Sequence, residues 1–193
     1  MEQLDEMLLE LKDTSELMID LAYSSLLYNN KEIAEEVVTM EEMLDELANK
    51  IQRQAIERVV NDKDEEKAFT VIKLAAAVEE ISDAAMQIAM VTINDPEPHP
   101  VIRLSIKDAD TTITLAEVKD GSDLVGKTLG KMRLASQSGM WAVAIKRGRK
   151  YVFGPDKSTV VEVGDVIISR GPPDAEKYFQ DLCLGKERLE EPY

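Results

Sequence analysis

The feature that most constrains the fold of this chain is the distribution of its helix-breaking residues. Residues 2–93 contain neither proline nor glycine, whereas residues 96–100 carry a proline at every second position. Each proline disfavours a helical backbone at the residue before it, and repeated prolines make a stiff, extended connector. We therefore expect one domain in residues 1–93, a linker in residues 94–104 and a second domain in residues 105–193.

The first domain is predicted to be helical because its apolar residues recur at steps of three and four, the period of one helix face. The first helix is expected to end near Asn29 and Asn30. The second runs to about Val60, and residues 61–64 separate it from the third. Short loops make consecutive helices antiparallel neighbours, so we expect a three-helix antiparallel bundle. Its core is thin, and we expect a second copy of the chain to complete it.

The second domain replaces the helical period with short apolar runs and period-two alternation, which are typical of strands. The expected order is β-α-β-β-β-α, so the fold class is α followed by a small α/β domain. Strands are expected at residues 112–118, 140–145, 150–153 and 160–169. Helices are expected at residues 124–134, interrupted by Gly126 and Gly130, and at residues 172–184.

Three segments of the second domain form a specific combination: SDLVGKTL at residues 122–129, VAIKRG at residues 143–148 and VGDVI at residues 163–167. Together they resemble the RCK C-terminal domain, also called the TrkA-C domain. The resemblance implies a dimeric ligand-binding module, of the kind found in cytoplasmic regulators of potassium and other cation transporters.

The first domain carries two Glu-x-x-x-Asp spacings, Glu41 with Asp45 and Glu79 with Asp83. In these spacings and in the residues around them, the domain is similar to one three-helix unit of the PhoU family. PhoU proteins usually carry two such units and bind multinuclear metal clusters through these carboxylates. Since this chain has one unit, the resemblance implies that two chains supply the pair.

Spacing alone places each of these carboxylate pairs on one helix face, because residues four apart are neighbours on a helix. Glu79 also falls in the apolar stripe of its helix, where an uncompensated carboxylate is costly. Two facing pairs would offer oxygen ligands for a divalent metal ion. The alternative is that the carboxylates are solvated, or that Glu79 pairs with Arg53 or Arg58.

Composition excludes several classes of partner and activity. The formal net charge of −15 argues against binding to a nucleic-acid backbone or to anionic lipid by charge alone. One cysteine, Cys183, allows no intrachain disulfide, and no apolar run reaches the ~20 residues of a membrane-spanning helix. Neither a dinucleotide-binding nor a phosphate-binding glycine loop is present, and a single histidine offers no nucleophilic triad. We therefore expect a cytoplasmic protein that is not an enzyme and does not insert into the membrane.

Candidate ligand-binding residues lie around the predicted hairpin of the second domain. Relatives that bind a cyclic dinucleotide carry Arg and Asn at the positions of Ala135 and Trp141, so this chain departs from their pattern. An apolar patch and a basic cluster take their place, and the candidate residues are Met140, Trp141, Lys146, Arg147 and Arg149.

The leading functional hypothesis is a homodimeric, ligand-sensing regulatory subunit of potassium or other cation transport, which acts on a membrane transporter or channel. The alternative is a PhoU-type adaptor that binds divalent metal ions and regulates phosphate uptake. Metal at the four carboxylates favours the adaptor, and a small molecule at the hairpin favours the sensor.

Overall fold

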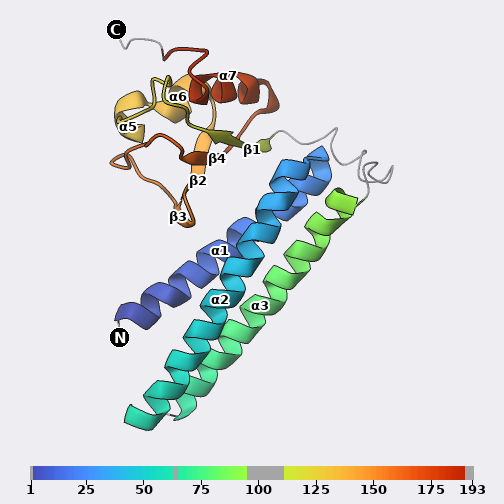
Figure 1. Ribbon diagram of the computed structural model, residues 1–193, viewed down its shortest axis with the longest axis vertical. Coiled ribbons are helices and arrows are strands. Elements are labelled where there is room, and N and C mark those ends of the chain that lie inside the picture. The colour runs from blue at the N-terminus through green and yellow to red at the C-terminus, as the bar shows by residue number, and fades with distance from the viewer. Residues whose placement is uncertain (1, 63–64, 95–110, 190–193) are drawn as a thin grey trace. The chain divides into compact units, whose positions relative to one another are not determined.

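The computed structural model describes residues 2–62, 65–94 and 111–189 (Figure 1). The chain divides into two compact units, residues 1–107 and 108–193. The predicted linker falls almost wholly outside the described residues, so its bounds stay a prediction.

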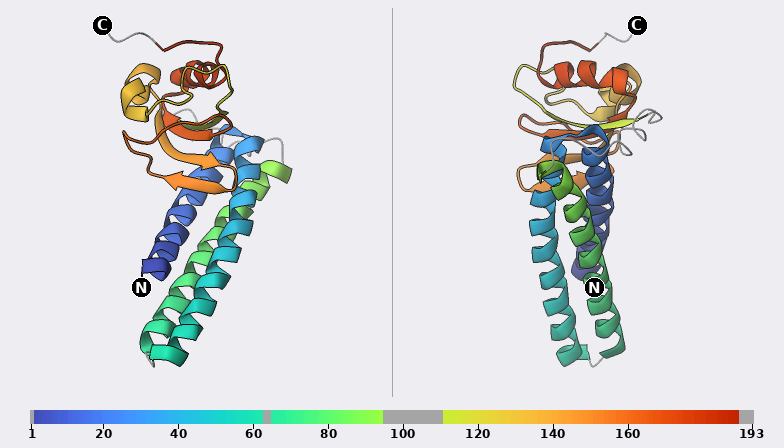
Figure 2. Two further views of the ribbon diagram at one scale, coloured as in Figure 1. Left: turned by 60° about the vertical axis from the view of Figure 1, so that its left-hand side comes forward. Right: turned by 90° about the vertical axis from the view of Figure 1, so that its right-hand side faces the viewer.

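Unit 1 is the expected bundle of three antiparallel helices, which lie side by side in Figures 1 and 2. The helices are α1 (Glu2–Tyr28), α2 (Lys31–Asp62) and α3 (Glu65–Asn94). The turn between α1 and α2 depends on two asparagines. Asn29 takes a left-handed φ of 49°, which asparagine tolerates better than most residues. The side chain of Asn30 then accepts a hydrogen bond of 3.1 Å from the backbone N–H of Ile33 and caps α2.

The core of the bundle is built unequally by the three helices. Large side chains of α1 and α2 are fully buried, among them Leu11, Met18, Leu21, Ile33, Met40, Leu44 and Ile51. In α3 the buried residues are all small: Ala68, Ala75, Ser82, Ala85, Ala89 and Thr92. Small side chains let α3 approach the other helices closely. Most of the larger apolar residues of α3 therefore lie at the edge of the buried face or on the exposed surface of the helix.

Unit 2 is a four-stranded antiparallel sheet with helices, and it confirms the predicted α/β class. The strands are β1 (Thr112–Glu117), β2 (Trp141–Arg147), β3 (Lys150–Phe153) and β4 (Val166–Gly171), in the order β1-β4-β2-β3. Its helices are α5 (Leu129–Met132), α6 (Leu134–Ser138) and α7 (Pro173–Cys183). Phe179 of α7 is fully buried in a core with residues of the sheet, including Ile145 and Ile167.

The helix predicted at residues 124–134 is shorter than expected and broken in two. Gly126 has a left-handed φ of 72°, so the helix cannot begin before it. Thr128 caps α5 instead, because its hydroxyl accepts the Lys131 N–H at 3.2 Å. Arg133, at φ 50°, then separates α5 from α6.

The last predicted strand also begins later, at Val166 rather than near Val160. The segment before it bonds to the turn that precedes α5. The Gly126 N–H donates to the Val161 carbonyl at 2.8 Å, and the Val161 N–H donates to the Lys127 carbonyl at 3.0 Å. These bonds hold residues 160–161 outside the four-stranded sheet.

Candidate functional site

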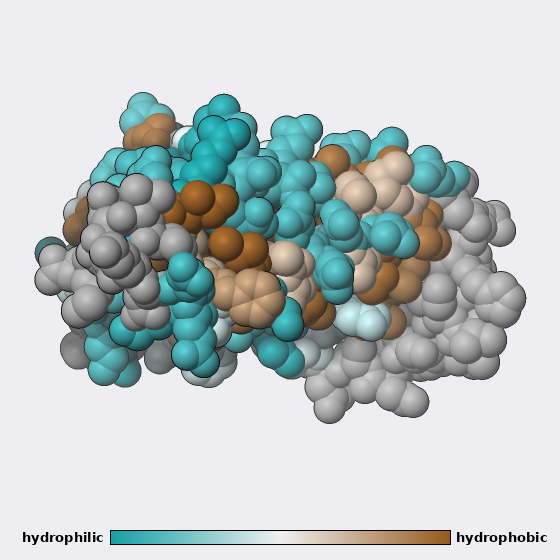
Figure 3. Space-filling model, turned by 90° about the horizontal axis from the view of Figure 1, so that it is seen from below, coloured by the Kyte–Doolittle hydropathy of each residue, from teal (hydrophilic) through white to brown (hydrophobic). Residues whose placement is uncertain are grey.

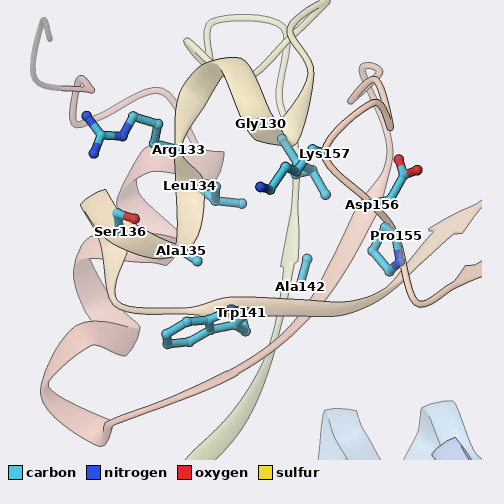
Figure 4. Close-up of a pocket in the computed structure, with 11 residues that line it drawn as sticks. Gly130, Arg133, Leu134, Ala135, Ser136, Trp141, Ala142, Pro155, Asp156 and Lys157 are labelled. Carbon is cyan, nitrogen blue, oxygen red and sulfur yellow. The ribbon is translucent and has the colours of Figure 1, made fainter.

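A surface cavity of about 810 Å³ lies in unit 2, between α5, α6, the start of β2 and the loop after β3 (Figure 4). It is lined by Leu129, Gly130, Arg133, Leu134, Ala135, Ser136, Trp141, Ala142, Pro155, Asp156 and Lys157. A cavity of this size suits a small-molecule ligand.

One wall is set by close contact between α5 and the loop after β3. The Gly130 N–H donates to the Lys157 carbonyl at 2.9 Å. A Cβ atom on Gly130 would lie only 2.7 Å from that oxygen, so glycine is required for this approach. The left-handed backbone of Arg133 turns the chain from α5 into α6, which forms the rest of the wall.

The opposite wall is apolar and comes from the first residues of β2. Trp141 pairs with Arg170 of β4 in the sheet, yet 64% of its surface is exposed. In Figure 4 the indole of Trp141 lies along one side of the cavity, the Lys157 ammonium points into it, and the Asp156 carboxylate points away. An exposed indole of this kind is a surface on which a flat ligand ring can stack.

The charged groups around the cavity favour an anion. Among the charged lining residues, the Lys157 ammonium points into the cavity in Figure 4, whereas the Arg133 guanidinium and the Asp156 carboxylate both point away from it. That carboxylate accepts hydrogen bonds from its own loop, from the Ser158 hydroxyl at 2.7 Å and the Ser158 N–H at 2.8 Å. These bonds, together with those from Thr159, lower the pKa of Asp156. The carboxylate is therefore held by its loop, and the cavity has a positive balance within an acidic chain.

The five predicted ligand residues are spread over different environments. Trp141 lines the cavity, whereas Met140 is fully buried in the core. Lys146 is half-buried, with its ammonium 6.0 Å from the centre of the Tyr151 ring, and Arg149 is exposed at the hairpin turn.

Arg147 makes an ion pair inside unit 2. Its guanidinium donates two hydrogen bonds of 2.8 Å to the carboxylate of Asp165, whose side chain is only 1% exposed. A further bond of 2.7 Å goes to Glu162. The bonds to Asp165 are the main cause of the raised pKa of Arg147. The guanidinium thus braces the turn before β4.

Sequence reasoning missed Arg133 and Lys157 as lining residues. Neither residue lies in a recognised binding or catalytic motif, and neither adjoins the predicted hairpin of the second domain, where the candidate ligand residues were expected. Only the contact between α5 and the loop after β3 brings them to one cavity, so no local pattern could have identified them.

The four carboxylates of unit 1 meet at the interface of α2 and α3. Burial, followed by the charges of Asp45 and Asp83, raises the pKa of Glu41. The same causes raise the pKa of Glu79, and this is the opposite of what pairing with an arginine would do. One carboxylate oxygen of Asp45, Oδ1, is buried without a hydrogen-bond partner.

Proximity of these groups does not amount to a preformed metal site in one chain. Within residues 2–62, 65–94 and 111–189, no group of three or more His, Cys, Asp or Glu side chains is placed to hold a metal ion. Metal binding at Glu41, Asp45, Glu79 and Asp83 therefore stays a prediction. No helix in the described part of the chain is long and apolar enough to cross a membrane.

Two curated proteins are similar to parts of this chain. The Ktr system potassium uptake protein A of Vibrio alginolyticus is 40% identical over 62 residues, which cover 32% of this chain and 28% of that protein. The chain thus spans little more than a quarter of that relative. The ammonium/H(+) antiporter subunit AmhM of Alkalihalophilus pseudofirmus is 21% identical over 124 residues, which cover 64% of this chain and 72% of that protein.

Among solved structures, the RCK_C domain dimer of S. agalactiae BusR in complex with c-di-AMP is 26% identical. The match covers 37% of this chain and 95% of that chain, with a TM-score of 0.36.

Family models match the two units separately, the PhoU domain at residues 8–92 and the TrkA-C domain at residues 113–184. The chain therefore carries a PhoU domain followed by a TrkA-C domain.

Proposed function

We propose that this chain is a cytoplasmic regulatory subunit of potassium or other cation transport, and that the cavity of unit 2 receives its effector. The observation that carries the proposal is a cavity inside a TrkA-C domain that has an exposed tryptophan and a lysine ammonium directed into it. The names of the two curated relatives, a potassium uptake protein and an ammonium/H(+) antiporter subunit, point to the same kind of partner.

The lining of the cavity indicates the chemistry of the effector. Trp141 offers a ring face, and Leu129, Leu134 and Pro155 add apolar surface. Lys157 would attract a negative charge, since cations bind phosphate and carboxylate groups. An anion with a flat ring, such as a nucleotide, satisfies both requirements.

Regulation would follow from differential binding. An effector shifts a protein between two arrangements only if it binds one of them more tightly. We propose that the subunit works as a homodimer beside a membrane transporter or channel, and that the effector favours one arrangement of the two chains. The expectations that the chain is not an enzyme and does not bind nucleic acid stay predictions.

The test uses Trp141, the only tryptophan of the chain, as the reporter. The full chain is titrated with ATP, NAD, cyclic dinucleotides and inorganic phosphate while tryptophan fluorescence is followed. We expect one nucleotide class to quench or shift the emission, and Lys157→Gln to weaken that binding about tenfold, as loss of a charge-assisted bond does. Lys150→Gln, on the exposed start of β3, is the control. Unchanged emission with every nucleotide, or equal weakening by the control, would contradict the proposal.

A second candidate is a metal-binding adaptor for phosphate uptake, favoured by the PhoU match and by the carboxylates between α2 and α3, where burial and neighbouring charges raise the pKa of Glu41 and Glu79. These carboxylates are hard oxygen ligands that suit Mn²⁺ or Mg²⁺. Calorimetric titration of the full chain with Mn²⁺ tests it. Binding that Glu79→Gln abolishes supports the adaptor, and heat that is the same for the parent and the variant argues against it.

A further inference from the structure

An exposed apolar stripe runs along α3 beside its buried face, and it is distinct from the predicted core stripe of this helix that includes Glu79. Its members are Leu74, Ala77, Ile81, Ala84, Ile88 and Val91, which follow one another at steps of three and four. Five of the six are exposed, including Leu74 at 49%, Ile81 at 43% and Val91 at 48%. At ~1.5 Å per residue the stripe is about 26 Å long.

This stripe is unusual for a solvated helix face. It contains no charged residue, although 32% of the residues in the chain are charged. The arrangement of α3 is also inverted, because small residues fill its buried face while Leu74, Ile81 and Val91 point outward. Figure 3 shows one face of the molecule on which apolar groups lie in several patches among polar ones. A contiguous apolar patch of this kind marks an interaction surface.

The repeat predicts what covers the stripe. Apolar residues at alternating steps of three and four form the seam between two helices in a coiled coil. If two copies of α3 run antiparallel, Ala77 faces Ile88 and Ile81 faces Ala84 of the second copy, while Leu74 faces Val91. Each layer then combines a larger side chain with a smaller one, as a close-packed interface requires. A parallel pair would instead place Ala against Ala and leave gaps.

The charges beside the stripe are compatible with the antiparallel arrangement. The exposed residues on its outer flank are Lys73, Glu80, Gln87 and Asn94. In the antiparallel register Glu80 lies opposite Gln87 of the second copy, and Lys73 lies opposite Asn94. No like charges meet, and amide groups can bond to each charged partner.

We propose that α3 is the homodimer surface of the helical unit, with the α3 stripes of two copies packed antiparallel. The inference rests on the homodimer of the proposed function and assigns it a surface outside the effector cavity. It requires neither an effector nor a metal ion, so each proposal can fail while the other stands.

Cysteine cross-linking of the full chain tests both the surface and the direction. The double variant Ala77→Cys/Ile88→Cys should form an intermolecular disulfide under mild oxidation, because these positions face each other across the antiparallel seam. Either single variant should stay uncross-linked, because its cysteine lies about 16 Å along the axis from its own copy. The native Cys183 does not interfere, since it is fully buried and burial raises the pKa of its thiol to about 12.

A charge variant checks the result independently of new cysteines. Ile81→Glu places a carboxylate in the centre of the seam and should lower the cross-linked fraction of the double variant at least about tenfold. Ile56→Glu on α2 is the matched control, since Ile56 is also an exposed isoleucine, and should have no effect. Cross-linking of a single variant means a parallel pair and overturns the proposal. A double variant that does not cross-link, or that cross-links equally with Ile81→Glu, overturns it as well.

Discussion

At the residue scale, the Arg147–Asp165 pair shows how one buried charge depends on its neighbour. Asp165 is almost fully buried, and it also accepts the Glu162 N–H at 2.8 Å, so its carboxylate holds the turn before β4. Removal of one partner of such a pair leaves a buried charge with too few bonds, which costs more than the pair itself contributes.

We expect Arg147→Met to lower the free energy of unfolding by about 2 kcal/mol, near the lower end for buried pairs because the arginine is about one-third exposed. Urea denaturation of unit 2, followed by Trp141 fluorescence, measures the change. Lys150→Met, an exposed cation of the same hairpin, should change stability by less than about 0.5 kcal/mol. Equal effects would mean that the ion pair does not support the turn.

Glu41 provides a pH-dependent prediction. Its pKa is raised in the folded chain, first by burial and then by the carboxylates of Asp45 and Asp83. The folded chain therefore binds more protons than the unfolded chain between the ordinary and the raised pKa, and its stability falls as pH rises through that window.

Glu41→Gln should accordingly stabilise unit 1 by roughly 0.5 kcal/mol at neutral pH, because it removes a charge that burial and the neighbouring carboxylates both disfavour. The gain should vanish below about pH 3, where the parent carboxyl is protonated in both states. Thermal denaturation of both chains at several pH values measures this. Glu57→Gln, an exposed glutamate of α2, makes the same change in net charge away from the cluster. A gain of equal size in this control would attribute the effect to net charge alone.

At the element scale, α5 depends on its contact with the loop after β3. The helix is one turn long, so its position comes from bonds to neighbours rather than from its own propensity. The Leu129 N–H donates to the Thr159 carbonyl at 3.0 Å, and Gly130 packs directly on Lys157. The position of this cavity wall therefore depends on the contact between α5 and the loop after β3.

Gly130→Ala should destabilise unit 2 by about 1–3 kcal/mol, because the added methyl group would overlap the Lys157 backbone. It should also weaken any ligand bound in the cavity, since the wall has to move. Urea denaturation and the fluorescence titration measure the two effects. Gly121→Ala is the control, because a Cβ there meets no atom within 4 Å. A neutral result for Gly130→Ala would show that the loop can shift freely.

At the scale of the whole molecule, each unit has its own buried core. Leu44 is fully buried in the core of the bundle, and Ile145 is fully buried in the core of the sheet unit. The two residues belong to the two compact units of the chain, residues 1–107 and 108–193. A cooperative unfolding transition belongs to one core, so a chain with two cores need not melt as one.

We expect calorimetry to resolve two transitions that respond to different substitutions. Leu44→Ala should lower only the transition of the helical unit, and Ile145→Ala only that of the sheet unit, each by about 2–5 kcal/mol of unfolding free energy. The two variants serve as controls for each other. If either variant lowers both transitions equally, the units unfold together.

The sequence alone determined the features that depend on local backbone chemistry. The three helices follow from the apolar period, and the asparagines at 29 and 30 predicted the first break. Pro173 at the start of α7 was equally informative, because its missing N–H has no helical partner there. The Glu-x-x-x-Asp spacings also placed each carboxylate pair on one helix face.

Only the tertiary structure decided which distant groups meet. Arg147 was predicted as a ligand residue, yet it bonds to Asp165, 18 positions away, and this contact leaves no local pattern. The cavity likewise joins α5, α6 and the start of β2 to a loop beyond β3. Arg133 divides the helix predicted at residues 124–134, and left-handed backbone at a non-glycine residue is imposed by packing. Local propensity acts over a few residues, whereas a binding site is made by contacts between segments far apart in the chain.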